Sequence, residues 1–215
     1  MRTKTIVFTA KMRAAFMDQE VPEPQAGQVL VQSSVSLIST GTECICFRGE
    51  FDEGTNWSGW VKYPFYPGYS AVGQVARVGP GVVGLAEGDA VFTGGSHQQW
   101  NVVEAEDLIK LPAGVSHEDA SWSALAVITQ TAVRRAEHTM GDTAVVIGLG
   151  PLGQMVRNTC ASSACGRFWR LTRSPGGWRS RPDMAPRRRS TAAPPTRVTS
   201  SPAKPKGGLP TWYTT

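Results

Sequence analysis

The stretch Ala144–Gly153 constrains the fold of this 215-residue chain more than any other part of its sequence. Its first four residues are apolar, and they lead directly into the glycines Gly148, Gly150 and Gly153. A buried strand that turns on such glycines into a helix opens a dinucleotide-binding unit. The sequence therefore predicts a strand from Thr143, a glycine loop, and a helix over Leu152–Ala164.

Each glycine of this loop has a predicted role in holding a dinucleotide. Gly148 allows the tight turn after the strand, Gly150 lets a pyrophosphate approach the backbone, and Gly153 lets the helix pack close to the strand. The start of the helix adds free N–H groups and the positive end of the helix dipole. We assign cofactor binding to Gly148, Leu149, Gly150, Pro151, Leu152 and Gly153.

The second half of the fingerprint is an acidic residue about 20 positions further on, which binds the ribose. The corresponding window, Arg167–Arg173, has neither an acid nor an apolar strand pattern. Synonymous back-translation of 167–178, read from the third base of the first codon, gives Val-Leu-Ala-Val-Asp, an apolar strand ending in an acid. We therefore hypothesise a single-nucleotide frameshift near Gly166 that truncates the cofactor domain. The alternative is a natural basic tail.

Short apolar runs bounded by glycine and proline precede the glycine loop. Many short strands at close spacing are typical of a small β-barrel or β-sandwich. Asp119–Glu137 lacks Gly and Pro, which predicts a helix with Ser116 as its N-cap. The fold class is therefore α+β leading into α/β. The predicted strands are Thr5–Phe8, Val29–Val35, Ala71–Val78, Gly88–Phe92, Trp100–Val103 and Leu108–Leu111.

The net charge of +5 averages two unlike segments. The last 49 residues hold 11 Lys and Arg, one acid and 8 of the 15 prolines, whereas the preceding residues hold 11 basic and 16 acidic ones. A tail of this composition, without a strand or helix period, is expected to be disordered. We place domain boundaries at 1–138 for the β domain, 139–166 for the first strand–helix unit and 167–215 for the tail.

The order of several short motifs in the β domain carries a resemblance to a known family. The motifs are Thr40–Glu43, Pro67–Gly73, Gly79–Val82, Gly88–Val91 and Leu111–Pro112, followed by the glycine loop. They resemble the medium-chain dehydrogenase/reductases, alcohol-dehydrogenase-like enzymes with a GroES-like barrel before a Rossmann domain. The subgroup with a Ser-Thr-Gly-Thr-Glu motif, which includes bacteriochlorophyllide-type dehydrogenases, is the most similar. The resemblance implies an NAD(P)-dependent oxidoreductase acting on a carbonyl, an alcohol or a conjugated double bond of a small-molecule substrate.

Zinc-dependent members of this family hold their metal with cysteine, histidine and acidic ligands. At the matching positions this chain has Thr40, Tyr69 within Gly68–Ser70, and the stretch Ser123–Thr131, which contains no Cys, His, Asp or Glu. We therefore expect no zinc and no other metal. The pair Cys44 and Cys46 has no nearby histidine and is interpreted as two ordinary thiols.

Three residues are candidates for catalysis in place of a metal. Thr42 matches the family position whose hydroxyl relays the substrate proton, and Tyr69 stands where the ligand histidine would be, so either hydroxyl could supply an acid. His97 is the third candidate, and its alternative is a histidine that only packs in a loop. Five aromatic residues before Pro67 line an apolar substrate pocket or else form a packed insertion: Trp57, Trp60, Tyr63, Phe65 and Tyr66.

The sequence also bounds the location and the class of function. It contains no run of 18 apolar residues and no signal-peptide core, which predicts a cytoplasmic protein without a membrane partner. A Rossmann domain represented by a single strand and helix is expected to bind NAD(P) poorly, so the chain as written is expected to be inactive. Two alternatives come from different classes: a folded fragment without catalysis, and a weak nucleic-acid binder whose basic tail contacts phosphates non-specifically. The basic residues of the tail have little regular order, which disfavours nucleic acid as a partner. The sequence assigns no oligomeric state and no preference between NAD and NADP.

Overall fold

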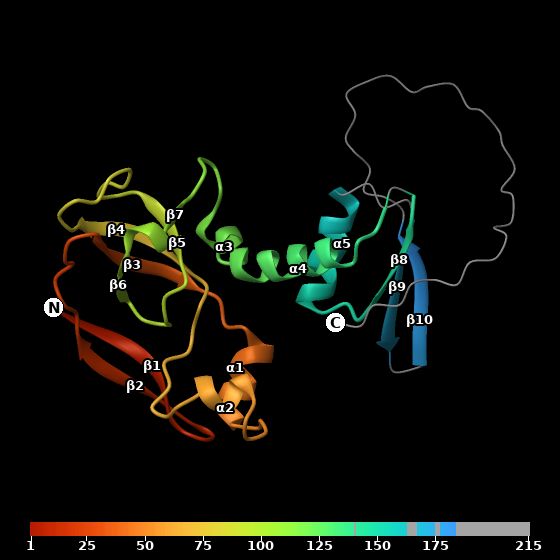
Figure 1. Cartoon of the computed structure of the whole chain (residues 1–215), viewed down its shortest axis with the longest axis horizontal. Coiled ribbons are helices and arrows are strands. Elements are labelled where there is room, and N and C mark those ends of the chain that lie inside the picture. The colour runs from red at the N-terminus through yellow and green to blue at the C-terminus, as the bar shows by residue number, and fades with distance from the viewer. Residues whose placement is uncertain (140, 163–166, 175–176, 184–215) are drawn as a thin grey trace, which may run out of the picture. The chain divides into compact units, whose positions relative to one another are not determined.

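A computed structural model describes residues 1–139, 141–162, 167–174 and 177–183 (Figure 1). The chain divides into two compact units, Met1–Ala124 and Leu125–Thr215. We describe each unit by itself. The boundary predicted at 138/139 and the one at 166/167 remain predictions.

The first unit contains a two-stranded sheet and a five-stranded sheet. The small sheet pairs β1 (Arg2–Ala10) with β2 (Arg13–Glu20). The larger sheet has the order β6-β3-β4-β5-β7, and all its neighbouring strands are antiparallel. Its strands are β3 (Gln28–Ser36), β4 (Ala71–Val78), β5 (Ala90–Thr93), β6 (Trp100–Glu104) and β7 (Ile109–Lys110).

Valines from three strands of the larger sheet form one hydrophobic core. Val29 and Val31 of β3 pack with Val75 of β4 and Val91 of β5, and all four are almost completely buried. The first two are two residues apart, so they lie on the same face of the strand. Strands β3, β4 and β5 therefore form because one face of each is removed from water, whereas both residues of β7 are exposed. All six predicted strands are confirmed within a few residues.

A second core contains three of the five aromatic residues that precede Pro67, namely Trp57, Tyr63 and Phe65, whereas Trp60 and Tyr66 are exposed. Phe8, Cys46, Val61 and Phe65 are buried, and partly buried side chains that include Trp57 and Tyr63 pack against them. Two short helices contribute to this core, α1 (Thr40–Arg48) and α2 (Asn56–Trp60), which lie close together in Figure 1. The structure thus favours the packed-insertion interpretation of this cluster over the substrate pocket.

The helix predicted over Asp119–Glu137 is interrupted in the structure. It consists of α3 (His117–Ala120), whose N-cap Ser116 accepts a hydrogen bond from the Asp119 N–H, and α4 (Ser123–Arg135). The carbonyl of Ser121 accepts the Ser70 hydroxyl at 2.5 Å in the interior. The chain makes a turn at residues 121–122, where the Ser121 carbonyl takes part in this tertiary contact. The single long helix was therefore the wrong prediction, and the predicted N-cap at Ser116 was right.

The second unit contains the predicted strand, loop and helix. Strand β8 (Thr143–Ile147) leads into α5 (Pro151–Ser162), and the three-stranded sheet has the order β10-β9-β8. Strand β9 (Arg167–Ser174) is parallel to β8, and β10 (Gly177–Asp183) is antiparallel to β9. The expectation of a disordered segment from 167 is therefore corrected for these two strands, where backbone pairing of β9 with β8 and of β10 with β9 supplies an order that composition does not predict. Residues 184–215 lie outside the described residues.

Candidate functional site

The start of helix α1 is held by a buried carboxylate. Glu43 lies in the first turn, and its Oε1 accepts the backbone N–H of the N-cap residue Ser39 at 2.9 Å. The Ser39 side chain makes no capping hydrogen bond, so the contact from its backbone N–H to the Glu43 carboxylate is the side-chain hydrogen bond at this helix start. A negative charge is also favoured at this end of a helix by the helix dipole. The Glu43 side chain is 6% exposed and therefore needs partners for both of its oxygens.

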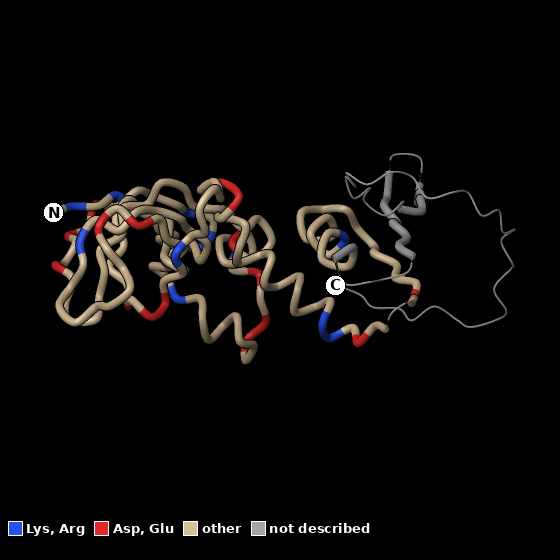
Figure 2. Tube along the Cα trace, turned by 90° about the horizontal axis from the view of Figure 1, so that it is seen from above, with Lys and Arg blue, Asp and Glu red and all other residues tan. Residues whose placement is uncertain are grey.

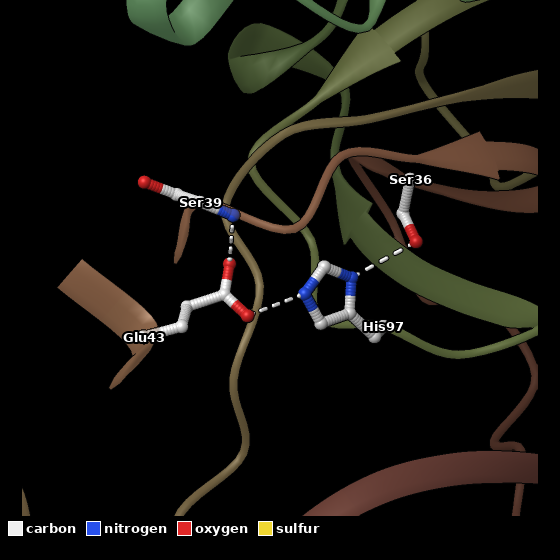
Figure 3. A network of polar contacts seen from close by, with 4 residues as sticks. All are labelled: Ser36, Ser39, Glu43 and His97. Carbon is white, nitrogen blue, oxygen red and sulfur yellow. Dashed lines mark hydrogen bonds and ion pairs between the residues drawn. The ribbon is translucent and has the colours of Figure 1, made fainter. Parts of the chain in front are cut away.

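The second partner of Glu43 is His97, which comes from the loop between β5 and β6 (Figure 3). His97 Nε2 lies 2.8 Å from Glu43 Oε2, and its Nδ1 lies 2.9 Å from the Ser36 hydroxyl at the end of β3. An ionised carboxylate only accepts hydrogen bonds, so Nε2 carries a hydrogen that it donates to Glu43. Both ring nitrogens of the predicted catalytic histidine are therefore engaged inside the protein.

The backbone around His97 is tied to three other segments. The His97 N–H donates to the Pro67 carbonyl at 2.9 Å, and the His97 carbonyl accepts the Ile6 N–H at 3.0 Å. On the next residues, Gln98 donates to Asn101 and accepts the Thr5 hydroxyl, while Asn101 donates to Ser33. The loop that carries the histidine is thus fixed by side-chain amides as well as by backbone bonds.

The segment that carries Tyr69 is anchored on both sides of that residue. Gly68 adopts a φ of +111°, and a Cβ built on it would lie 2.6 Å from the His97 backbone nitrogen. On the other side, the Ser70 hydroxyl donates to the Ser121 carbonyl, and the Ser70 carbonyl accepts the Leu37 N–H. Tyr69 itself is half-buried.

Thr42 and Tyr69 differ from His97 in having unused donors. Both side chains are half-buried, and within the described part of the chain neither hydroxyl has a hydrogen-bond partner. A hydroxyl in this state can donate a proton to an added ligand. Thr42 is next to Glu43 in sequence, and Tyr69 follows the glycine that packs on His97. The three predicted residues therefore belong to segments joined by the Glu43–His97 contact.

Sequence reasoning missed Glu43 and Ser36 as members of this network. Glu43 was present in the Thr40–Glu43 motif, and an acid four residues after a serine N-cap is a signal of a helix start. We did not predict α1, so that signal had no structural context. Nothing in the sequence pairs Glu43 with His97, because 54 positions separate them.

The two neighbouring cysteines lie on α1 and are free thiols. Burial, and secondarily the Glu43 carboxylate, raises the pKa of the Cys46 thiol, so it stays protonated and unreactive. Burial and then Cys46 also raise the pKa of Tyr63, whose hydroxyl donates to the Cys46 carbonyl at 2.6 Å. Over the described residues, no three His, Cys, Asp or Glu side chains form a group that could hold a metal ion.

The glycine loop of the second unit has the geometry that close packing requires. Gly148 has a φ of +94°, and a Cβ on Gly153 would collide with the Gly148 carbonyl oxygen. A Cβ on Gly150 would meet no atom within 4 Å, so the space beside this residue is open. Pro151 begins α5, where its missing N–H costs nothing. These are the features that a pyrophosphate cradle needs, and the residues present fit such a group.

The described helices do not include one with the length and apolar character to cross a bilayer. The first unit contains two antiparallel sheets and the second a β–α–β unit with a glycine loop, and alcohol-dehydrogenase-like proteins have similar elements. In agreement, residues 25–113 match the family profile of the alcohol dehydrogenase GroES-like domain.

Curated relatives and solved structures extend this match beyond the GroES-like domain. The chain is 26% identical over 173 residues to 2-desacetyl-2-hydroxyethyl bacteriochlorophyllide A dehydrogenase of Cereibacter sphaeroides, covering 73% of the chain and 52% of that relative. It is 29% identical over 171 residues to D-guloside 3-dehydrogenase of Escherichia coli, covering 71% and 49%. The crystal structure of 2R,3R-butanediol dehydrogenase from Bacillus subtilis superposes with a TM-score of 0.69 at 20% identity, covering 80% and 58%.

Residues 25–113 thus resemble the GroES-like domain of alcohol dehydrogenases, and the chain as a whole is similar to medium-chain dehydrogenase/reductases. It spans about half the length of the curated relatives it matches. The neighbouring structure of RspB from Escherichia coli CFT073, with a TM-score of 0.65 at 21% identity over 76% of this chain and 54% of that one, contains NADH.

Proposed function

We propose that this protein is an NAD(P)-dependent oxidoreductase that works without zinc and acts on a carbonyl, an alcohol or a conjugated double bond. The observation that carries the proposal is the glycine loop between β8 and α5, where Gly153 packs on Gly148 and Gly150 borders open space. The named dehydrogenases among its relatives support the same reaction class.

Residues of the loop would hold the cofactor through its pyrophosphate. The backbone N–H groups at the start of α5 face the end of β8, and Gly150 leaves room for phosphate oxygens beside the chain. When bound, the nicotinamide supplies or accepts the hydride. We assign the loop from Gly148 to Gly153 to this role.

Thr42 and Tyr69 are the proposed proton donors for the substrate oxygen. Their hydroxyls are half-buried and unpaired within the described residues, whereas both nitrogens of His97 are engaged. Reduction of a carbonyl requires a proton as well as a hydride, and a hydroxyl can deliver it without a metal. We therefore propose direct catalytic roles for Thr42 and Tyr69, whereas His97 acts indirectly, through other residues.

The zinc-free part of the proposal rests on donor chemistry. Thr40 and Tyr69 occupy two of the ligand positions of the zinc-dependent members, and neither side chain is a usual zinc ligand. Metal analysis of the purified protein is expected to find zinc far below one equivalent. Stoichiometric zinc that survives dialysis against a chelator would contradict this part.

The experiment that tests the cofactor site is a titration with NADH and with NADPH. The chain as written contains one β–α–β arrangement in its described part, whereas a full dinucleotide site uses two halves, so we expect weak binding. Cofactor fluorescence and saturation-transfer NMR at millimolar cofactor measure it. Saturation at low micromolar concentration would contradict the expected weakness.

The variants Gly150→Val and Gly59→Val serve as a matched pair for this titration. Both glycines border open space and neither has a positive φ, but only Gly150 lies in the loop. Gly150→Val is expected to abolish the saturation-transfer signal, while Gly59→Val keeps it. A signal that survives in Gly150→Val, or no signal from the unsubstituted chain, would contradict the proposed site.

A further inference from the structure

The contact between Glu43 and His97 lies between the two segments that carry the proposed proton donors. Glu43 follows Thr42 directly on α1, and His97 packs through its backbone on Pro67 and Gly68, which precede Tyr69. The His97 ring reaches from the loop between β5 and β6 to the carboxylate on the helix (Figure 3). This side-chain bridge connects α1 to the His97 backbone, which in turn bonds to Pro67, and it adds to the backbone bond between the Leu37 N–H and the Ser70 carbonyl.

The bridge is built to hold a fixed geometry. His97 and Glu43 have side chains that are 3% and 6% exposed, and each polar atom of the pair has a partner: Ser39 N–H and Nε2 for the carboxylate, Ser36 for Nδ1. A buried ionisable pair is seldom retained for stability, because apolar side chains of similar size do as well. Such a pair is better explained by a structural role, which is to fix the positions of the two segments that it joins.

We propose that Glu43 and His97 are positioning residues, which fix the start of α1 and the Pro67–Tyr69 segment relative to each other and thereby place the Thr42 and Tyr69 hydroxyls. Ser36 holds the ring plane of His97 from the other side. The catalytic consequence rests on the function proposed above. The positioning itself is a property of the folded chain and can be measured without cofactor or turnover.

The test uses the 215-residue protein with ¹⁵N-labelled histidine rings and ¹³C-labelled tyrosine and threonine. The unsubstituted chain is expected to show His97 with hydrogen on Nε2. In Glu43→Gln the amide accepts the Ser39 N–H and donates to Nε2, so the ring hydrogen is expected on Nδ1, where it donates to Ser36. Tyr69 and Thr42 signals are expected to stay near their original positions, because the bridge is rebuilt.

The disruptive variants are Glu43→Ala and His97→Ala, and the matched control is Glu50→Ala, an exposed acid just after α1. Both disruptive variants are expected to shift the Thr42 and Tyr69 signals by more than the control does. Where either variant fails to fold, Ser36→Ala and Glu43→Gln still give the comparison, with a smaller shift expected from the loss of the Ser36 contact. A folded Glu43→Ala protein with unmoved Thr42 and Tyr69 signals, or a Glu43→Gln protein with the original tautomer, would overturn the proposal.

These outcomes separate this inference from the proposed function. An absent cofactor signal with the expected NMR shifts would reject the cofactor site and leave the positioning contact in place. Conversely, cofactor binding that depends on Gly150, together with unmoved Tyr69 signals in Glu43→Ala, would leave the oxidoreductase proposal in place and reject the positioning role.

Discussion

Gly68 is the residue at which the backbone of the candidate site leaves no room for a side chain. Its φ of +111° lies in the region that residues with a Cβ rarely adopt, and the added carbon would lie within 3 Å of Ser96 and His97 backbone atoms. These atoms cannot move aside independently, since the His97 N–H is bonded to the Pro67 carbonyl. The conformational strain and the steric overlap therefore add.

Gly68→Ala is expected to lower the free energy of unfolding by about 2–4 kcal/mol. The left-handed backbone conformation contributes about 1–2 kcal/mol of this loss, and overpacking against the neighbouring backbone contributes the remainder. Gly81→Ala is the control, because Gly81 has a φ of +78° with nothing near its Cβ position. Only the strain, about 1 kcal/mol, applies there. Urea unfolding measures both, and equal losses would show that the contact with His97 carries no cost.

The two thiols of α1 offer a chemical readout of burial at single residues. Cys46 is fully buried with a raised pKa, whereas Cys44 is half-buried. The thiolate is the reactive form, so alkylation by iodoacetamide at neutral pH is expected to modify Cys44 at least tenfold faster than Cys46. Peptide mass spectrometry at timed intervals measures the two rates. Unfolding in urea should remove the difference, and equal rates in the native protein would contradict the described packing.

At the scale of elements, strand β2 and helix α1 show where sequence patterns fail. Strand β2 has almost no buried residue, and Phe16 on it is 76% exposed, so no apolar alternation marks it. It forms because its backbone pairs with β1, which is a tertiary effect. Helix α1 begins with Thr-Gly-Thr, which are weak helix formers, and its start depends on the Glu43 carboxylate. By contrast, β3 and β4 were predictable because their apolar residues form a hydrophobic core, and β8 was predictable from its apolar run before the glycine loop.

The candidate site divides in the same way. Thr42, Tyr69, His97 and the glycines were found from local motifs and their order. The pairing of His97 with Glu43 and Ser36 was not, because it joins positions 54 and 61 residues apart. Such contacts depend on how α1 and the β5–β6 loop are placed by the fold, and a single sequence contains no local trace of that placement.

The Asp89 carboxylate, which directly precedes β5, forms an ion pair with a side chain of the neighbouring strand β7. Asp89 Oδ1 lies 2.7 Å from Lys110 Nζ on β7, and Oδ2 accepts the Ala86 N–H at 2.9 Å. The hydrogen bond from Lys110, followed by that from Ala86, lowers the pKa of Asp89. A carboxyl group whose pKa is lower in the folded state stabilises the fold above its unfolded pKa, about 3.9, and this contribution disappears as the pH falls through the folded pKa.

Asp89→Asn is therefore expected to lower the melting temperature at pH 7, with a difference from the parent that shrinks below about pH 4. Circular dichroism melts between neutral and strongly acidic pH follow this difference. The control is Asp107→Asn, at an exposed position on the short 3-10 helix Ala105–Asp107 before β7. A melting difference for Asp89→Asn that is constant with pH would show that its carboxylate contributes no charge-dependent stability.

At the scale of the whole molecule, the two units differ in the buried contacts that stabilise a fold. Both hydrophobic cores and the Glu43–His97 network lie within Met1–Ala124. Acidic and basic residues are interspersed along the trace of this unit in Figure 2. The first unit therefore contains what a small domain requires to fold by itself.

A chain ending at residue 138 is accordingly expected to fold cooperatively and to keep the His97 signals of the full protein. A chain ending at residue 115 is the control, since it lacks α3 and with it the Ser121 carbonyl that accepts the buried Ser70 hydroxyl. An unsatisfied buried hydroxyl costs about 1–3 kcal/mol, and the lost packing of Ala120 adds to this. Thermal melts and overlaid ¹H–¹⁵N spectra compare the two chains with the parent. If the longer chain melts without a cooperative transition, then the first unit depends on residues beyond 138, and the domain boundary predicted there is wrong.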